Sequence, residues 1–177
     1  MRRRDLLATL AGAGLSATAG CSALLSGGSD EQASDAITVE TLDAPGSEAG
    51  TATVPARDRV SFVEFFATTC SVCAAQMPRL RTAHERVGAD VQFLSVTSEP
   101  VGLTVSRGEV VSWWADHDGA WPVAVDDGTV LARRYDATSV PKAVVLAPDG
   151  TVTWSHTGAV EASAVVEAIE DAAGELA

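Results

Sequence analysis

The feature that most constrains the fold is an almost continuous apolar segment, residues 60–67, which is followed at once by a helical pattern. The segment has the length of one strand, and its composition is typical of a strand that helices cover on both faces. Glu64 is its only charged residue. From residue 71 apolar side chains recur at helical spacing as far as Gly88, which is expected to end the helix. A strand that leads directly into a helix indicates an α/β domain, and open sheets of this class place their sites at the strand's carboxyl end.

The rest of the chain alternates strand and helix patterns. Strands are predicted at residues 37–42, 91–96, 121–125, 142–146 and 152–155. Helices are predicted at residues 105–117, 129–135 and 160–173. Residues 43–59, with two prolines and two glycines, are interpreted as a connector. The expected fold class is therefore α/β, with a central mixed sheet flanked by helices.

The four tryptophans are expected to pack in the core or at its edge rather than to form a partner surface; they are Trp113, Trp114, Trp121 and Trp154. Two of them, with Val110 and Val111, are expected to form the buried side of the 105–117 helix.

The helix that begins at residue 71 starts at a pair of cysteines, Cys70 and Cys73, separated by Ser71 and Val72. The first thiol of such a pair lies at the helix N-terminus, where the helix dipole and free N–H groups stabilise its thiolate. The second thiol lies one turn further in, close enough to attack a mixed disulfide on the first. A structural disulfide is a weaker alternative, because so short a loop constrains little of the unfolded chain. A metal site is weaker too, because zinc needs four ligands and the three histidines are not closely spaced.

The first 21 residues have the pattern of an export signal. Arg3 and Arg4 have the arrangement of a twin-arginine signal. The apolar run that follows them is too short to span a bilayer, which takes about 20 residues. The small residues before Cys21 are typical of a lipoprotein cleavage box, although ordinary signal peptidase could also cleave after Ala19. We therefore expect residues 1–20 to be a signal peptide and Cys21 to carry a lipid.

Three segments follow from this division of the chain. Residues 21–36 are rich in Ser, Gly, Asp and Glu and are expected to form a flexible tether, with residues 37–177 as the folded domain. The expected location is the extracytoplasmic face of the cell membrane.

The chain is strongly acidic, with a formal net charge of −12, and Lys142 is its only lysine. Such a surface repels phosphate backbones, so no nucleic-acid partner is expected. Many Asp and Glu residues with almost no lysine also resemble the composition of proteins from extreme halophiles.

Residues 63–73 resemble the signature strand and active-site turn of the thioredoxin-like family. Pro78 matches the proline inside that family's active-site helix, Val140-Pro141 matches its cis-proline, and Gly158 matches a glycine before its last helix. Residues 121–150 are similar to the TlpA/ResA branch of extracytoplasmic thiol–disulfide oxidoreductases. The resemblance implies a thioredoxin-like fold with a TlpA-type mid-domain insertion, for which residues 98–127 have room. With the leader and the acidic composition, it implies a haloarchaeal-type exported lipoprotein.

The family likeness also implies roles for individual residues. Cys70 would attack a protein disulfide and Cys73 would resolve the mixed disulfide. Glu64, a costly charge in a buried strand, is expected to have a raised pKa and to take the proton from Cys73. Pro141 is expected to be cis and to face the cysteines, with Val140 and Thr69 as substrate contacts; Thr69 stands where relatives carry a tryptophan.

No organic cofactor and no metal are expected, only the redox-active disulfide Cys70–Cys73. The expected partners are exported protein thiols and disulfides, with apocytochrome c among the candidates, and a membrane thiol-reductant carrier, while the membrane itself is reached through the lipid on Cys21. The alternatives are a copper-handling binding module and a thiol peroxidase of the same fold. Substrate and direction of electron flow are not specified by the sequence, since potentials in such proteins span roughly 150 mV.

Overall fold

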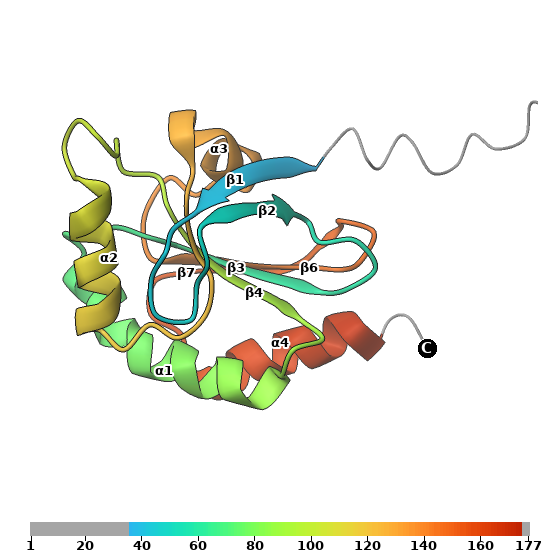
Figure 1. Cartoon of the computed structure of the whole chain (residues 1–177). Helices are drawn as coiled ribbons and strands as arrows, with labels where there is room; N and C mark the ends of the chain where they lie inside the picture. The colour runs from blue at the N-terminus through green and yellow to red at the C-terminus, as the bar shows by residue number, and fades with distance from the viewer. Residues whose placement is uncertain (1–35, 175–177) are drawn as a thin grey trace, which may run out of the picture.

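The computed structural model describes residues 36–174, which form a seven-stranded mixed sheet with helices on both faces (Figure 1). The strands are β1 (Ile37–Thr41), β2 (Gly50–Val54), β3 (Ser61–Phe66), β4 (Gln92–Thr97), β5 (Val123–Val125), β6 (Lys142–Leu146) and β7 (Val152–Thr157). The helices are α1 (Ser71–Val87), α2 (Arg107–Asp116), α3 (Val130–Arg134) and α4 (Ala162–Gly174), and a short 3₁₀ turn, η2 (Asp127–Thr129), precedes α3. The predicted α/β class with a central mixed sheet is confirmed.

β3 lies inside the sheet, whose strand order is β2-β1-β5-β4-β3-β6-β7. It runs parallel to β4, with Glu64 opposite Ser95, and antiparallel to β6, with Glu64 opposite Ala143. All six of its residues are buried, as the apolar run predicted. Because β3 leads into α1 through residues 67–70, the cysteines lie at the carboxyl end of an inner strand.

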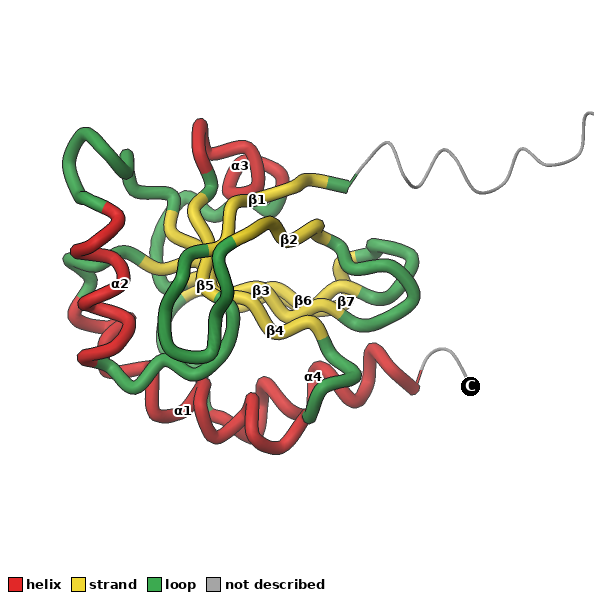
Figure 2. Tube along the Cα trace, viewed as in Figure 1, coloured by secondary structure: helices red, strands yellow, loops and turns green. Residues whose placement is uncertain are grey.

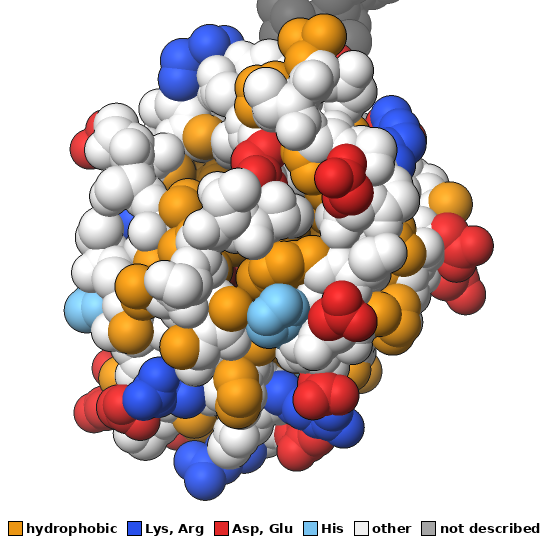
Figure 3. Space-filling view, turned by 90° about the vertical axis from the view of Figure 1, so that its left-hand side faces the viewer, with side chains coloured by type: hydrophobic (Ala, Val, Ile, Leu, Met, Phe, Trp, Pro, Cys, Tyr) orange, Lys and Arg blue, Asp and Glu red, His pale blue; other side chains and the backbone are white. Residues whose placement is uncertain are grey.

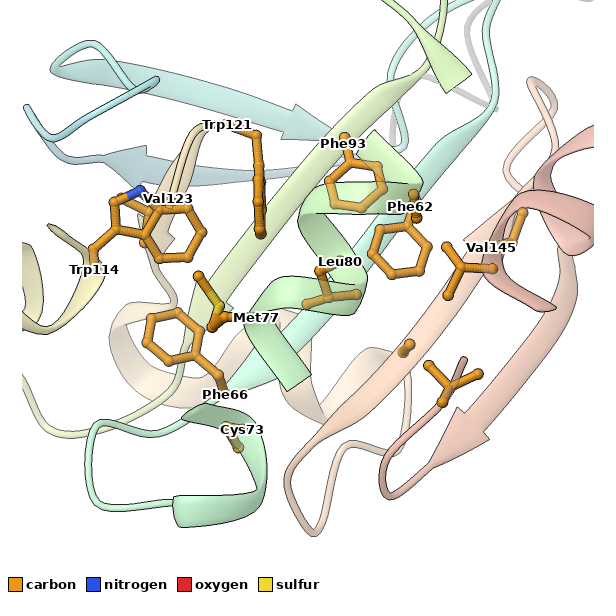
Figure 4. Packing of buried hydrophobic residues seen from close by; sticks show 14 of the residues in the cluster. Phe62, Phe66, Cys73, Met77, Leu80, Phe93, Trp114, Trp121, Val123 and Val145 are labelled. Carbon is orange, nitrogen blue, oxygen red and sulfur yellow. The ribbon is translucent and has the colours of Figure 1, made fainter. Parts of the chain in front are cut away.

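Side chains of β3 point alternately to the two faces of the sheet and contribute to two cores. Phe62 and Phe66 lie in the larger core, which α1, α2 and α4 cover (Figure 4). Val63 and Phe65 lie in the smaller core with residues of α3. Each fully buried phenylalanine contributes about 1.5–3 kcal/mol. Glu64 lies between Val63 and Phe65 in the strand and points to the same face as Phe62 and Phe66. Its side chain therefore enters the larger core.

The interpretation of residues 43–59 as a connector was wrong, because they contain β2. This strand pairs antiparallel with β1 along its whole length, from Ile37 opposite Val54 to Thr41 opposite Gly50 (Figure 2). The loop before it packs closely on the chain ahead of β5, where Gly46, with a φ of 73°, has no room for a Cβ against the backbone of Ala120. The Pro and Gly residues on both sides of this five-residue strand favoured a turn-rich connector over a strand in the sequence pattern.

The bounds of α1 agree with the sequence pattern, and those of α2 differ slightly. Gly88 ends α1 with a φ of 71°, as predicted. A capping box at Ser106 makes α2 begin at Arg107. The buried side of α2 is narrower than expected, because Val111 and Trp113 are only half-buried. These two side chains lie toward the margin of the larger core instead of within it.

The predicted signal peptide, Cys21 and the tether up to residue 35 lie outside the described residues. Within residues 36–174, no helix combines the length and apolar character needed to cross a bilayer.

Candidate active site

The cysteine pair lies in the turn between β3 and α1. The N–H of Cys70 donates to the carbonyl oxygen of Ala67 at 3.0 Å and closes a tight turn. Cys70 is the N-cap of α1, and its Sγ accepts the N–H of Cys73 at 3.0 Å. The two sulfurs form a disulfide, and the two Cα atoms are 5.2 Å apart. The first cysteine therefore stands at the helix terminus itself, as predicted.

The two sulfurs differ in accessibility. Cys70 is partly exposed, whereas Cys73 is fully buried in the larger core with Phe66 and Met77 (Figure 4). The first turn of α1 contains no acidic residue that would oppose the effect of the helix dipole on Cys70. An incoming partner can reach Cys70, and the thiolate of Cys70 is the one that the helix stabilises.

The loop that faces Cys70 carries the expected cis-proline. The Val140–Pro141 peptide bond is cis, and the carbonyl oxygen of Val140 lies 3.9 Å from Cys70 Sγ. The side chain of Val140 is exposed and that of Pro141 is buried. A second cis bond, Val54–Pro55 after β2, was not predicted.

Two hydrogen bonds fix this loop to the segment between β7 and α4, and through it to α1. The N–H of Gly158 donates to the carbonyl oxygen of Pro141 at 2.8 Å. Two residues further on, the N–H of Val160 donates to Oε1 of the buried Gln76 in α1 at 2.9 Å. Gln76 was not identified from the sequence, because its partner is 84 residues away along the chain.

Glu64 is fully buried, and burial raises its pKa to about 7. One hydrogen bond opposes that shift, since Ser95 Oγ donates to Glu64 Oε2 at 2.9 Å. Glu64 Oε1 is buried without a hydrogen-bond partner in the described structure. The carboxyl group thus enters the core that also contains Cys73, with one oxygen free.

Glu99 is a part of the site that the sequence did not reveal. Its Oε2 accepts the N–H of Thr68 at 2.8 Å and the hydroxyl of Thr97 at 3.0 Å, and its Oε1 accepts the hydroxyl of Thr68 at 2.9 Å. These bonds tie the segment after β4 to the turn that ends at Cys70. The two segments are 31 residues apart and meet only because β3 and β4 are adjacent.

Thr69 is exposed and lines a groove between the cysteine turn and α2. Trp113 also lines this groove, and its ring stacks on Phe66 with a centroid distance of 4.8 Å and on His117 at 4.4 Å. On this side of the molecule hydrophobic side chains gather in the middle of the face, with acidic side chains near them (Figure 3). The structure therefore brings Thr69 and Val140 to the surface near the outer sulfur.

A hollow larger than this groove lies elsewhere, between the loop before β2 and the end of α1, and contains none of the cysteine-turn residues. Its size therefore does not identify the site. Across residues 36–174 no group of three His, Cys, Asp or Glu side chains could together hold a metal ion.

An accessible sulfur at a helix N-terminus, a buried second sulfur and a facing cis-proline define the class: the protein is a thiol–disulfide oxidoreductase of thioredoxin-like fold. The chain belongs to the Redoxin family, whose model matches residues 30–172. A relative described as mercury resistance operon ORF3, from Streptomyces lividans, is 29% identical over 136 residues, covering 74% of this chain and 67% of the relative.

Solved structures share the fold. StoA from Bacillus subtilis superposes with a TM-score of 0.64 at 16% identity, over 75% of this chain and 95% of that protein. The pneumococcal exposed lipoprotein thioredoxin from Streptococcus pneumoniae gives 0.62 at 22% identity, over 74% and 98%. A secreted Mycobacterium tuberculosis disulfide oxidoreductase gives 0.61 at 18% identity, over 80% and 98%. The predicted thioredoxin-like fold is confirmed.

Proposed function

We propose that the protein is an extracytoplasmic, lipid-anchored oxidoreductase of the TlpA/ResA branch that exchanges disulfides with exported proteins. One observation carries the exchange chemistry: the accessible Cys70 sulfur faces the exposed Val140 loop, while Cys73 is buried directly behind it. A partner can thus form a bond with the first sulfur only.

The exchange proceeds in two displacement steps. The Cys70 thiolate attacks one sulfur of a partner disulfide, and the other partner sulfur leaves as a thiolate with the bonding electron pair. Cys73 then attacks Cys70, forms the Cys70–Cys73 disulfide and displaces the second partner sulfur as a thiolate. The partner is reduced by two electrons, and the reverse sequence oxidises it.

Glu64 serves the second step. Cys73 is buried, where its thiol form is favoured, so it needs a base at the moment of attack. Burial raises the pKa of Glu64 to about 7, which matches a base that accepts a proton near neutral pH and later returns it.

The partner segment lies across Val140, Pro141 and Thr69. The carbonyl oxygen of Val140 lies 3.9 Å from Cys70 Sγ, so an extended segment bound at Cys70 can pair with the Val140 backbone. Thr69 contacts the same segment from the groove beside α2.

The membrane location rests on the leader. The twin-arginine pattern, the cleavage box before Cys21 and the polar residues up to 36 support an exported domain on a lipid anchor. Exported protein thiols and disulfides, apocytochrome c among them, are the substrates that fit this location, and a membrane thiol carrier would supply electrons. The acidic composition suits concentrated salt, as in a haloarchaeal lipoprotein.

Trapping in the native host tests this function. Cys73→Ser should accumulate covalent complexes with exported proteins through Cys70, because resolution is blocked. The Cys70→Ser, Cys73→Ser double variant is the matched control and should capture none. Recovery of no disulfide-linked partner, or of equal amounts by both variants, would contradict the proposal.

A further inference from the structure

A line of buried hydrogen bonds reaches Glu64 from the strands beside it. Trp121 Nε1 donates to Ser95 Oγ at 3.0 Å, and Ser95 Oγ donates to Glu64 Oε2 at 2.9 Å. Glu64 is 1% exposed, and Ser95 and Trp121 are 0% exposed. The sheet register explains the alignment, because Glu64 lies opposite Ser95, and Ser95 opposite Val123, two residues after Trp121.

The direction of this line is fixed by chemistry. An indole N–H can only donate, so Ser95 Oγ must be the acceptor in the first bond. The hydroxyl has a single proton, which is therefore committed to Glu64 Oε2. Oε2 then remains an acceptor whether Glu64 is charged or neutral. The proton of neutral Glu64 belongs on Oε1, the oxygen that has no partner in the described structure.

The indole ring has little freedom to break the line. Trp121 makes edge-to-face contacts with Trp114, at a centroid distance of 5.0 Å, and with Phe93, at 5.3 Å (Figure 4). His84 lies against its ring at 5.5 Å. Close packing on several sides holds Nε1 within hydrogen-bonding distance of Ser95 Oγ.

We propose that Ser95 and Trp121 are positioning residues that act through Glu64, holding Oε2 as an acceptor so that Oε1 exchanges the proton with Cys73. The inference rests on the proposed role of Glu64. In the resolving step the proton of the Cys73 thiol moves to Oε1, Cys73 Sγ forms a bond to Cys70 Sγ, and the bond from Cys70 to the partner breaks. The partner sulfur leaves with the electron pair and takes a proton from solvent.

The surroundings of Glu64 contain few other groups that titrate. On α1 these are Cys73 and His84, the latter reaching the line only through Trp121. The buried residues of α2 and α4 are all apolar, and Ala143 is opposite Glu64 on β6. The Ser95 hydrogen bond lowers the pKa of Glu64 and burial raises it, so loss of that bond must raise the pKa further.

Two variants and a matched control test the line. Ser95→Ala removes the donor to Glu64, and Trp121→Phe lets the hydroxyl turn and accept a proton from neutral Glu64, so both raise its pKa. Ser61→Ala is the matched control: it also removes a buried serine hydroxyl, one that accepts the N–H of Ala56 at 2.9 Å, but Ser61 lies on the opposite face of β3 from Glu64.

The readout is the pH profile of mixed-disulfide resolution, measured by quenching single turnovers. Its rising limb should move up by about one pH unit in Ser95→Ala, by less in Trp121→Phe, and not at all in Ser61→Ala. Well below the pKa, resolution in Ser95→Ala should be roughly tenfold slower. Carboxyl NMR titration of Glu64 in the oxidised variants should show the same shifts without depending on turnover.

An unchanged Glu64 titration in both Ser95→Ala and Trp121→Phe would overturn the inference while leaving the role of Glu64 in place. Glu64→Gln separates the two claims, because it should abolish the limb near pH 7 and leave only the rise at higher pH in which hydroxide deprotonates Cys73. A limb that stays near pH 7 in Glu64→Gln would remove Glu64 as the base and the inference with it, whereas trapping on Cys70 would still stand.

Discussion

Glu64 is a carboxyl group whose charged form the fold disfavours. Burial raises its pKa from an ordinary 4.5 to about 7. Between these values the folded state keeps a proton that the unfolded state has lost, so stability falls as pH rises through the window. Above pH 7 the whole penalty is present, which amounts to roughly 3 kcal/mol. A buried acid that lowers stability at neutral pH is expected where function requires it.

Glu64→Gln should therefore stabilise the oxidised protein at high pH. The gain in the free energy of unfolding should be roughly 3 kcal/mol larger at pH 8 than at pH 4, where wild-type Glu64 is mostly neutral in both states. Guanidinium unfolding at the two pH values measures it. Glu167→Gln, which removes an exposed carboxylate of α4, is the control and should show a much smaller difference. A gain for Glu64→Gln that does not depend on pH would contradict the assignment.

At the scale of elements, Glu99 joins the segment after β4 to the turn between β3 and α1. Its carboxylate accepts three hydrogen bonds, two of them from Thr68. Hydrogen bonds to a charged acceptor are stronger than neutral ones. The turn that presents Cys70 is therefore held from a neighbouring strand as well as by its own bond to Ala67.

Glu99→Ala should loosen this turn without unfolding the domain. We expect a loss of about 1–3 kcal/mol in the free energy of unfolding, because donors of Thr68 lose their acceptor. Hydrogen exchange should accelerate at the amides of residues 67–70, and Glu99→Gln should largely restore their protection. Asp116→Ala is the control, because Asp116 and Glu99 both line the groove between the cysteine turn and α2. Equal exchange at these amides in Glu99→Ala and Asp116→Ala would argue against the link.

At the scale of the whole molecule, the local features of the fold could be predicted from the sequence and the long-range contacts could not. β3, α1 and the position of Cys70 follow from contiguous patterns, and the cis bond at Pro141 follows from the family resemblance. Ser95, Glu99 and Trp121 meet the site only through the order and register of the strands, which no local pattern encodes. β2 was missed because its flanking turn residues outweighed five weakly apolar positions.

In the proposed function, the whole domain carries out disulfide exchange through Cys70 first and Cys73 second. The order of the two cysteines can be tested with reduced wild-type, Cys70→Ser and Cys73→Ser proteins. Each is mixed with a disulfide-bonded peptide and quenched with acid, and the products are identified by mass spectrometry. The wild type should yield a Cys70–Cys73 disulfide and free peptide thiols. Cys73→Ser should stop as a one-to-one mixed disulfide on Cys70, and Cys70→Ser should react far more slowly than either. A Cys70→Ser variant that reacts as fast as the wild type would show that Cys70 is not the first sulfur to react.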